Sequence, residues 1–437
     1  MSRTSTTDWA SQAVGDLFDM QLGKMLSAAT RSGPRQRPFL ANRNVQWNRI
    51  DLNDVETMHF SPSEDQSFGL ESGDLLVCEG GEIGRTAIWA GELADCHIQN
   101  AVHRLRPRDG AIVPRYFLHF MRYAADYGLF RRLSGQTSIA HLTKEGLGQL
   151  AVPLPPRLEQ TGIAETFDTV DDMIRLTERL IGKLELTKQG ILRDLLTRGI
   201  DENGNLRDPE LQPDSFHDTP LGLLPRTWTV RRLGDLLADV EPPMRSGPFG
   251  SALLKEELVD QGIPILGIDN VHVENFVRDY SRFVTAAKFR ELSRYAVRPN
   301  DIMITIMGTV GRCCEVPPGI GEALSSKHVW TLTIDQSVYV PSLVCLQVNY
   351  SEWVLRHFSK DTQGGIMSAI QAGTLRSVLL PTPPIHEQTE IASILMAQNS
   401  RLVALRDELS KLRLLKSGLM DDLLTGRVRV AAVEDAA

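Results

Sequence analysis

The sequence predicts an α+β protein with two pseudo-repeated globular domains, each followed by a long helix, the two helices pairing as an antiparallel coiled coil. Three observations predict this fold. An internal repeat covers nearly the whole chain. Within each copy, short runs rich in Val, Ile and Leu alternate with glycine-containing turns, as is typical of strands. Each copy then ends in a run whose apolar residues recur at alternating steps of three and four.

The repeat is clearest at the C-terminal end of each copy. The segment PLPPRLEQTGIA at 153–164 matches PTPPIHEQTEIA at 381–392, an offset of 228 residues. At the same offset, KQGILRDLLT at 188–197 matches KSGLMDDLLT at 416–425. The offset is only 219 near the start of each copy, which places an insertion in the second copy. We therefore expect two copies of one two-part unit.

The globular part of each copy predicts a mainly antiparallel sheet with helices. GDLLVCEGGEIGRT at 73–86 aligns with NDIMITIMGTVGRC at 300–313, and both have the β-branched residues and glycine turns of paired strands. Further along, PRYFLHFMRYAADYGLFRRL and PSLVCLQVNYSEWVLRHFSK show the mixed three-and-four spacing of helices.

The second part of each copy predicts a rod of about 38 helical residues, roughly 57 Å long. Its apolar seam consists, in the first copy, of Ile163, Phe167, Val170, Ile174, Thr177, Ile181, Leu184, Lys188, Ile191 and Leu195. The seam of the second copy consists of Ile391, Leu395, Gln398, Leu402, Leu405, Leu409, Leu412, Lys416, Leu419 and Leu423. Such a rod needs a partner for its apolar face, and the duplicate rod of the same chain is the simplest one.

Glycines mark both the ends and the interiors of these rods. Gly199 and Gly426 stand where helix C-terminal caps are expected. Two further glycines occupy equivalent positions inside the helices, Gly190 and Gly418. A helical glycine costs about 1 kcal/mol relative to alanine. Their repetition predicts a close helix approach, between the rods or against another protein; glycines that are merely tolerated are the alternative.

Composition sets limits on the class of protein. The 437 residues correspond to about three domain-sized units, and 42% hydrophobic with 23% charged residues excludes wholesale disorder. Five cysteines without paired spacing argue against a disulfide framework and a zinc site, and fit a reducing compartment. With no signal peptide and no apolar run long enough for a membrane, we expect a cytoplasmic protein. The net charge is −8, and much of it falls in 201–219, which has the composition of a linker.

Motifs of catalysis are missing from the sequence. It has no phosphate-binding G-x-x-x-x-G-K-[ST], no H-E-x-x-H, no G-x-S-x-G and no G-x-G-x-x-G after a strand. The histidines are scattered rather than clustered. We therefore expect no catalytic residues, no metal site and no enzyme activity in this chain by itself.

Several motifs recur in the same order in both copies: W-x4-[VL]-G-D-L, P-[FI]-L…N-V, [GN]-D-[LI], [GM]-G-x-[IV]-G-R, P-x-P-P-x-x-E-Q and D-x-L-L-T. The second copy also has SGPFGS at 246–251, where the first copy has no such form. In this order, twice over, the motifs resemble the specificity subunits of type I restriction-modification enzymes. The resemblance covers about residues 9–430 of the chain.

The resemblance implies a non-catalytic DNA-recognition subunit whose halves each read one half of a bipartite site. The helices are expected to set the spacer length and to dock two modification subunits, which methylate adenine, with restriction subunits completing the complex. S-adenosylmethionine, ATP and magnesium would then belong to the partners, and the partners would be double-stranded DNA and these subunits, with no membrane. The implied domains are 1–155 and 220–384 for recognition, 156–200 and 385–430 for the helices, 201–219 for an acidic linker and 431–437 for a tail.

Two sets of candidate site residues follow. Polar, basic and aromatic loop residues are the candidates for DNA contact, because Arg and Gln can bond base edges or phosphates: Lys24, Arg31, Arg35, Arg37, Arg43, Arg85, Gln136, Thr137, Arg245, Ser246, Phe249, Ser251, Arg312, Lys327 and Gln363. A second apolar stripe on the helices predicts subunit docking: Leu176, Leu180, Leu192, Leu196, Leu414, Leu415, Met420 and Leu424. Solvated surface arginines, and leucines packed on the chain's own domains, are the structural alternatives. A coiled-coil hub that binds only proteins is the alternative function.

Overall fold

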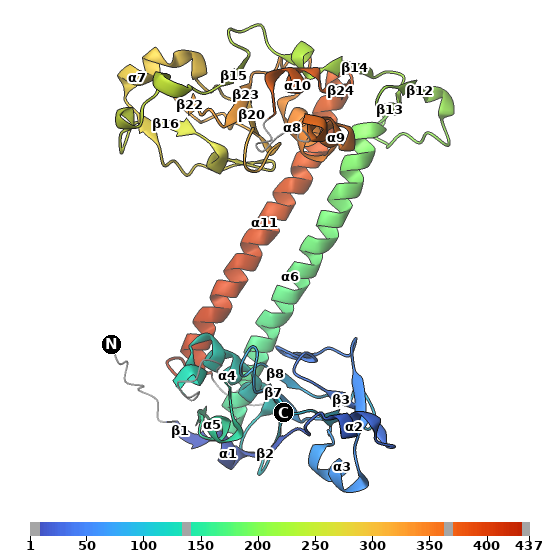
Figure 1. The fold of residues 1–437 in the computed structure, drawn as a ribbon, viewed down its shortest axis with the longest axis vertical. Helices are drawn as coiled ribbons and strands as arrows, with labels where there is room; N and C mark the ends of the chain where they lie inside the picture. The colour runs from blue at the N-terminus through green and yellow to red at the C-terminus, as the bar shows by residue number, and fades with distance from the viewer. Residues whose placement is uncertain (1–8, 133–140, 362–369, 431–437) are drawn as a thin grey trace, which may run out of the picture. The chain divides into compact units, whose positions relative to one another are not determined.

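The computed structural model describes residues 9–132, 141–361 and 370–430 and divides the chain into two compact units (Figure 1). Unit 1 contains residues up to 179 together with those from 406 onward, and unit 2 contains 180–405. Each unit therefore combines one globular part with segments of both long helices, so its limits differ from those of a simple globular domain followed by its own helix.

The elements of unit 1 run in the order β1 (Ala10–Ala13), α1 (Val14–Leu17), β2 (Phe18–Leu22), α2 (Ala28–Ser32), β3 (Gln36–Leu40), β4 (Val45–Gln46), β5 (Arg49–Ile50), β6 (Glu56–His59), α3 (Pro62–Phe68), β7 (Leu75–Cys78), β8 (Thr86–Ile88), β9 (His97–Ile98), β10 (Val102–Pro107), α4 (Pro114–Asp126), α5 (Lys144–Gly148), β11 (Ala151–Leu154) and the start of α6 (Arg157–Thr197). The predicted strand pair corresponds to β7 and β8, and the predicted helix to α4.

In unit 1 a four-stranded antiparallel sheet has the order β2-β10-β7-β8, and a three-stranded sheet has the order β6-β3-β9. The pairing of β3 with β9 is parallel, which departs from a purely antiparallel arrangement. A core of large side chains that includes Phe18, Tyr116, Phe117 and Phe167 joins the sheet, α4 and the first turns of α6.

The elements of unit 2 run in the order β12 (Phe216–Thr219), β13 (Gly222–Pro225), β14 (Thr229–Arg232), β15 (Met244–Ser246), β16 (Ile263–Leu266), β17 (Val271–His272), β18 (Asn275–Phe276), β19 (Phe283–Val284), α7 (Ala286–Glu291), β20 (Ile302–Thr305), β21 (Cys313–Glu315), β22 (Leu324–Ser325), β23 (Val329–Leu332), α8 (Pro341–Tyr350), α9 (Glu352–Asp361), α10 (Ala372–Ser377), β24 (Leu379–Thr382) and the start of α11 (Ile385–Leu423). The single helix predicted after β23 is in fact two, α8 and α9, which are interrupted at Ser351.

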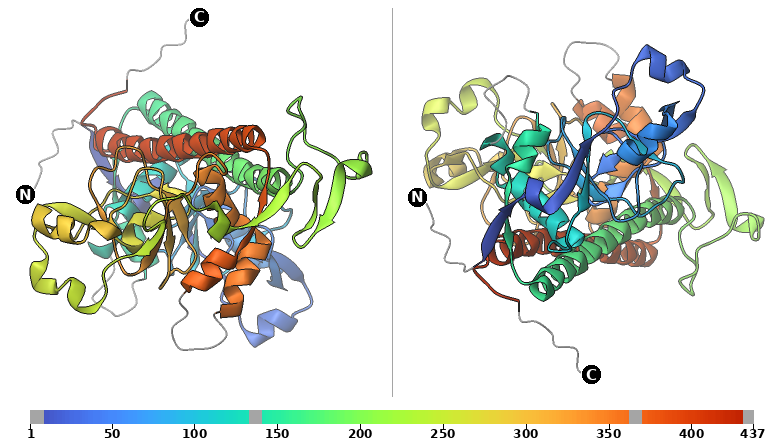
Figure 2. Two further views of the ribbon diagram at one scale, coloured as in Figure 1. Left: turned by 90° about the horizontal axis from the view of Figure 1, so that it is seen from above. Right: turned by 90° about the horizontal axis from the view of Figure 1, so that it is seen from below.

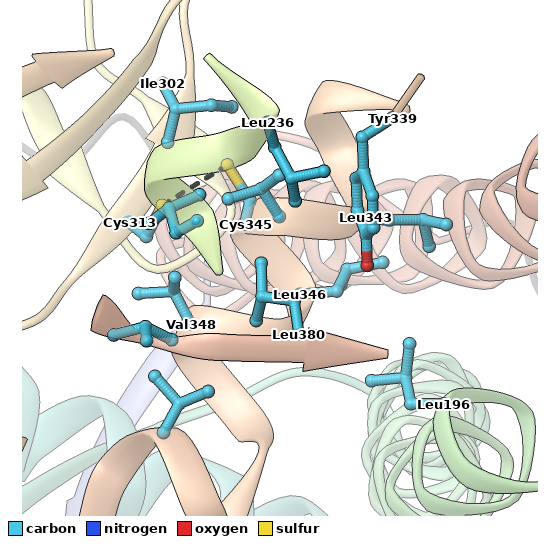
Figure 3. Close-up of a cluster of buried hydrophobic side chains, with 14 of the residues drawn as sticks. Leu196, Leu236, Ile302, Cys313, Tyr339, Leu343, Cys345, Leu346, Val348 and Leu380 are labelled. Atoms are coloured by element: carbon cyan, nitrogen blue, oxygen red, sulfur yellow. Dashed lines mark hydrogen bonds between the residues drawn. The ribbon is translucent and has the colours of Figure 1, made fainter. Parts of the chain in front are cut away.

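The strand order of unit 2 follows that of unit 1. Its four-stranded sheet is β15-β23-β20-β21, and its three-stranded sheet is β19-β16-β22, again with one parallel pairing. The core holds Tyr339, Leu343 and Leu346 of the α8 region and the free thiols of Cys313 and Cys345, whose sulfur atoms lie 3.4 Å apart (Figure 3). All five cysteines are buried and free.

The segment 201–219 is more ordered than its linker composition suggested. Its last residues form β12, which pairs with β13, and this hairpin projects from the rest of unit 2 (Figure 2). Before the hairpin, the Asp201 carboxylate accepts backbone N–H bonds from Asn203 and Asn205 and so closes a tight turn. Acidic residues in this segment therefore build local turns as well as facing solvent.

Each long helix buries its predicted seam. The seam residues of α6 and α11 are all buried or half-buried. Gly199 and Gly426 have φ values of +61° and +67°, as a helix C-terminal cap requires. The expectation of close packing at the interior glycines is wrong within this chain, because a Cβ atom on Gly190 or on Gly418 would meet no atom within 4 Å.

The Glu-Gln pair of the repeated P-x-P-P-x-x-E-Q motif anchors the first turn of each helix. In unit 1, Gln160 accepts the backbone N–H of Val113 at 2.8 Å, and in unit 2 Gln388 accepts that of Val340 at 2.9 Å. Both side-chain amides also donate to backbone carbonyls. The glutamine therefore joins the start of the helix to the chain that leads into α4 or α8.

The glutamate of the motif is buried. It accepts hydrogen bonds from an arginine in the segment that follows the other long helix. In unit 1, Arg429 donates two hydrogen bonds of 2.7 Å to Glu159. In unit 2, Glu387 is 3% exposed and accepts bonds from Arg207 (2.5 Å) and the Trp228 indole (3.0 Å). We call these two contacts the glutamate clasps.

The Glu387 clasp predicts a large stability effect for a small chemical change. Replacing Glu387→Gln removes the charge that Arg207 needs in a buried site, and we expect a loss of about 3 kcal/mol in the free energy of unfolding. Urea denaturation of the full chain measures it. The control is Glu352→Gln, which removes an exposed partner of Arg356 and should change stability by less than about 0.5 kcal/mol. Equal effects of the two substitutions would contradict a role for the clasp.

Candidate nucleic-acid interface

In both units, the residues that follow the first strand of the four-stranded sheet are hydrogen-bonded to a neighbouring segment of the chain. After β2, the N–H of Lys24 donates to the carbonyl of Ile98, and after β15 the N–H of Gly247 donates to that of Ser326. A Cβ atom on Gly23 would overlap the carbonyl oxygen of Gln99, and one on Gly247 would overlap that of Ser325. Only glycine allows this approach, so the residues that follow it are held in a fixed place.

In unit 2 the residues that follow Gly247 border a pocket of about 220 Å³. It is lined by Pro248, Gly250, Leu253, Leu254, Lys255, Leu258, Ile265, Arg282, Ser326, Lys327 and His328. The charged members are all cationic. Burial, together with the Lys327 and Arg282 charges, lowers the pKa of His328 below its ordinary value. The pocket is therefore a site of positive potential, suited to an anion such as a phosphate.

The cations of this pocket are available for a ligand. Among the residues that the structure describes, Lys255, Arg282 and Lys327 form no ion pair with a carboxylate, and Lys327 is exposed. Lys327 was a sequence candidate, whereas Lys255 and Arg282 were missed. Lys255 follows the SGPFGS loop after a few residues, but Arg282 precedes β19 and joins the pocket only through the pairing of β19 with β16.

In unit 1, most of the predicted DNA-contacting cations are neutralised within the chain. Ion pairs of 2.6 Å join four of them to carboxylates: Lys24–Glu64, Arg35–Asp65, Arg37–Asp95 and Arg43–Glu56. The hydrogen bond from Arg35 holds the pKa of Asp65 well below its usual range. Each of these four candidates therefore has a local carboxylate partner in the chain as it stands, and their contact with DNA stays a prediction.

Two other unit 1 candidates differ from each other. Arg31 is exposed at the end of α2 and makes no ion pair with another described residue. Arg85 is mostly buried and donates to the carbonyl of Asn42 at 2.6 Å, so it supports a loop. The amide side chains of Gln99 and Asn100, on the loop beside Gly23, were missed; as donors and acceptors they can bond base edges.

Arg245 was also predicted for DNA contact, and the structure corrects this. Its side chain is 2% exposed and pairs with the buried Asp301, and it also donates to the carbonyl of Ala296 at 2.6 Å. Asp301 in turn accepts a bond of 2.6 Å from Thr333. A buried arginine bound to a buried carboxylate holds the sheet together and cannot reach DNA.

The remaining candidates of unit 2 lie near the pocket or on neighbouring turns. Ser246 is buried and donates to the carbonyl of Lys327, Ser251 is exposed, and Phe249 is 62% exposed. Arg312 is half-buried without an ion pair to the described residues. The candidates Gln136, Thr137 and Gln363 lie outside the described residues.

The predicted docking stripe divides into two halves. Leu176, Leu180, Leu414 and Leu415 are exposed, by 38% to 71%. The other four are not part of a free surface: Leu192 and Leu196 belong to the core of unit 2, and Met420 and Leu424 to the core of unit 1. For these four the prediction is wrong, because they pack on the chain's own globular parts.

The described part of the chain holds no group of three or more His, Cys, Asp or Glu side chains that could bind a metal ion. Over the same residues, no helix combines the length and apolar character needed to cross a lipid bilayer.

Comparison with known proteins shows which family this chain resembles. Residues 6–186 match the family model described as the type I restriction modification DNA specificity domain. A sequence of Methanocaldococcus jannaschii, provisionally designated the MjaX type I restriction enzyme specificity subunit, is 24% identical and covers 97% of this chain and 94% of its own. This chain is therefore similar, over nearly its whole length, to a type I specificity subunit.

Solved structures support the fold. The S subunit of a type I restriction-modification system from M. genitalium superposes with a TM-score of 0.57 at 16% identity, covering 97% of this chain and 98% of its own. A chain from a study of complex assembly and conformational transition of the type I R-M system gives 0.56 at 15% identity, with 98% and 100% covered. The mixed helix and sheet architecture described above is therefore the fold of these solved chains as well.

The cationic pocket of unit 2 predicts a change in the salt dependence of DNA binding. Replacing Lys327→Ala or Arg282→Ala removes one phosphate contact, so the slope of log affinity against log salt should fall by about 1 for each. Fluorescence anisotropy of the full chain on duplex DNA over a salt series measures the slope. Arg356→Ala, which removes an exposed arginine on α9, is the control. An unchanged slope in both pocket variants would exclude the pocket from the interface.

Proposed function

We propose that each unit reads one half of a bipartite DNA site and that the paired helices α6 and α11 fix the distance between the halves. The observation that carries this proposal is the repeated strand framework, which presents different side chains at one equivalent place. Beside Gly23 these are the amides of Gln99 and Asn100, and beside Gly247 they are Ser326 and Lys327. Because different side chains bond different base edges, two copies of one framework can recognise two different sequences.

The pairing of the helices supports a fixed separation. In unit 1, Asp171 and Glu178 of α6 pair with Lys416 and Arg413 of α11, so residue numbers rise along one helix as they fall along the other. In unit 2, Lys188 donates to Asn399 at 3.0 Å, and nearer the end of α6 the N–H of Ile200 donates to Glu387. This is the pattern of an antiparallel pair. Polar partners within an apolar seam favour one register of the pair over the alternatives.

We further propose that two modification subunits dock on the exposed leucines of the helices, with restriction subunits joining the complex and with S-adenosylmethionine, ATP and magnesium bound by these partners. Leu186 and Leu414 are equivalent at the repeat offset of 228, and both are 71% exposed. An equivalent exposed leucine in each unit suits two copies of one partner. The alternative, a coiled-coil hub that binds only proteins, would use the same leucines but would show no sequence-specific DNA binding.

Exchange of one unit tests the two-reader model. Replacing residues 9–155 by the corresponding part of another specificity subunit should change one half of the recognised site and leave the other half and the spacer unchanged. Selection of bound duplexes from a random library, with the chain in complex with its modification subunits, reveals the site. The reciprocal exchange of 220–384 is the matched control and should change the other half. A change in both halves after either exchange would contradict independent reading.

Charged substitution of the exposed leucines tests docking. Leu414→Glu and Leu186→Glu should each remove one modification subunit from the complex, because a carboxylate cannot be buried unpaired in an apolar contact. Mass measurement of the co-purified complex gives the stoichiometry. Leu223→Glu, at a 49% exposed leucine of the β12–β13 hairpin, is the matched control. Full stoichiometry in both helix variants would place the docking surface elsewhere.

A further inference from the structure

Each unit exposes one large apolar side chain at the same place in its framework. The register of the strands shows the equivalence: Met20 of β2 lies opposite Leu105 of β10, and Met244 of β15 lies opposite Leu332 of β23. Five residues further along each chain are Met25, 69% exposed, and Phe249, 62% exposed.

The exposure of these two side chains is fixed by the backbone. The glycine two residues earlier in each unit, Gly23 or Gly247, packs against the carbonyl of the neighbouring loop so closely that no Cβ atom would fit. Gly250, directly after Phe249, has a φ of +58°, a conformation that few other residues adopt. The chain therefore presents the apolar side chain from a constrained loop rather than folding it into the core.

The surroundings of Phe249 indicate which kind of ligand it contacts. Its neighbours in sequence, Pro248 and Gly250, line the pocket that also holds Lys255, Arg282 and Lys327, three cations without carboxylate partners among the described residues. An apolar side chain bordered by unpaired cations suits a ligand with an anionic surface and apolar faces inside it. Duplex DNA has this combination, because phosphates surround stacked bases.

We propose that Phe249 and Met25 are equivalent wedge residues, each of which inserts between neighbouring base pairs of its own half-site while adjacent polar side chains hold the backbone. Phe and Met are among the side chains that proteins insert into base steps, partly unstacking them. This inference rests on the proposed function, because it requires each unit to bind one half-site. It adds a specific contact: the wedge selects steps that unstack easily, so it contributes to sequence preference without hydrogen bonds.

The experiment uses the full chain in complex with its modification subunits and the duplex selected from a random library. 2-Aminopurine, whose fluorescence rises when it is unstacked, is placed at successive positions of both half-sites. With the wild-type chain we expect a rise at one step in each half-site. Phe249→Ala should abolish the rise in one half-site and weaken binding about tenfold, and Met25→Ala should do the same in the other. Phe249→Leu keeps an apolar side chain and should retain part of the signal.

The outcomes separate the wedge from the function on which it rests. If the wild-type complex selects no bipartite sequence, the proposed function fails. If it selects one but Phe249→Ala and Met25→Ala leave every fluorescence signal unchanged, the wedge is wrong and the function stands. Loss of co-purifying modification subunits from Phe249→Ala, with DNA binding by the chain retained, would assign the residue to a protein interface instead. Leu223→Ala, at an exposed apolar residue of the β12–β13 hairpin, is the control and should leave both half-site signals in place.

Discussion

The fold depends on a buried carboxylate at the first turn of each long helix. Glu159 and Glu387 are 4% and 3% exposed, and a charge so deeply buried is tolerated only with a cation beside it. In each unit the cation comes from the segment that follows the other helix, as Arg429 or as Arg207. The residues of one copy of the repeat therefore cannot supply both the buried glutamate and the arginine that neutralises it. The start of one helix and the end of the other must fold together, which ties the two helices to each unit.

The sequence shows the clasp motif but not its role. The Glu-Gln pair is recognisable because it recurs in the same setting in both copies, and periodicity alone predicts the helices that it begins. The partner arginines lie 270 and 180 residues away from their glutamates, and no local pattern connects them. The same limit explains the exposed and buried halves of the docking stripe. Helical spacing places Leu192 and Leu176 on the same apolar stripe of the helix, but it cannot show that only Leu192 packs in the chain's own core.

The charge of a side chain does not show from the sequence whether that side chain is free for a ligand, for a related reason. Lys24, Arg35 and Arg37 are loop cations in the sequence, and each meets a carboxylate only when α3 and the turn before β9 fold beside it. Conversely, Arg282 gave no signal because strand pairing, not proximity in sequence, brings it to the pocket. The glycines were better guides, since Gly23 and Gly247 mark backbone approaches that no other residue permits. In this chain, the position of a residue in the strand framework therefore shows better than its type whether its side chain is held by the protein or presented from a fixed loop.

The two units also show how such a framework accepts different surfaces. Each has an aspartate before its central strand, Asp74 or Asp301, both almost fully buried. In unit 1, Arg106 of β10 neutralises Asp74 through two bonds of 2.8 Å. In unit 2, Thr333 follows β23 at the position equivalent to Arg106, and the cation comes instead from Arg245 of β15. The buried aspartate is thus present in both units, while the strand that supplies its arginine partner differs between them. Because neighbouring strands can each supply the cation, side chains on the sheet can change while the strand framework is kept. The loops that the framework carries are then free to diverge in sequence.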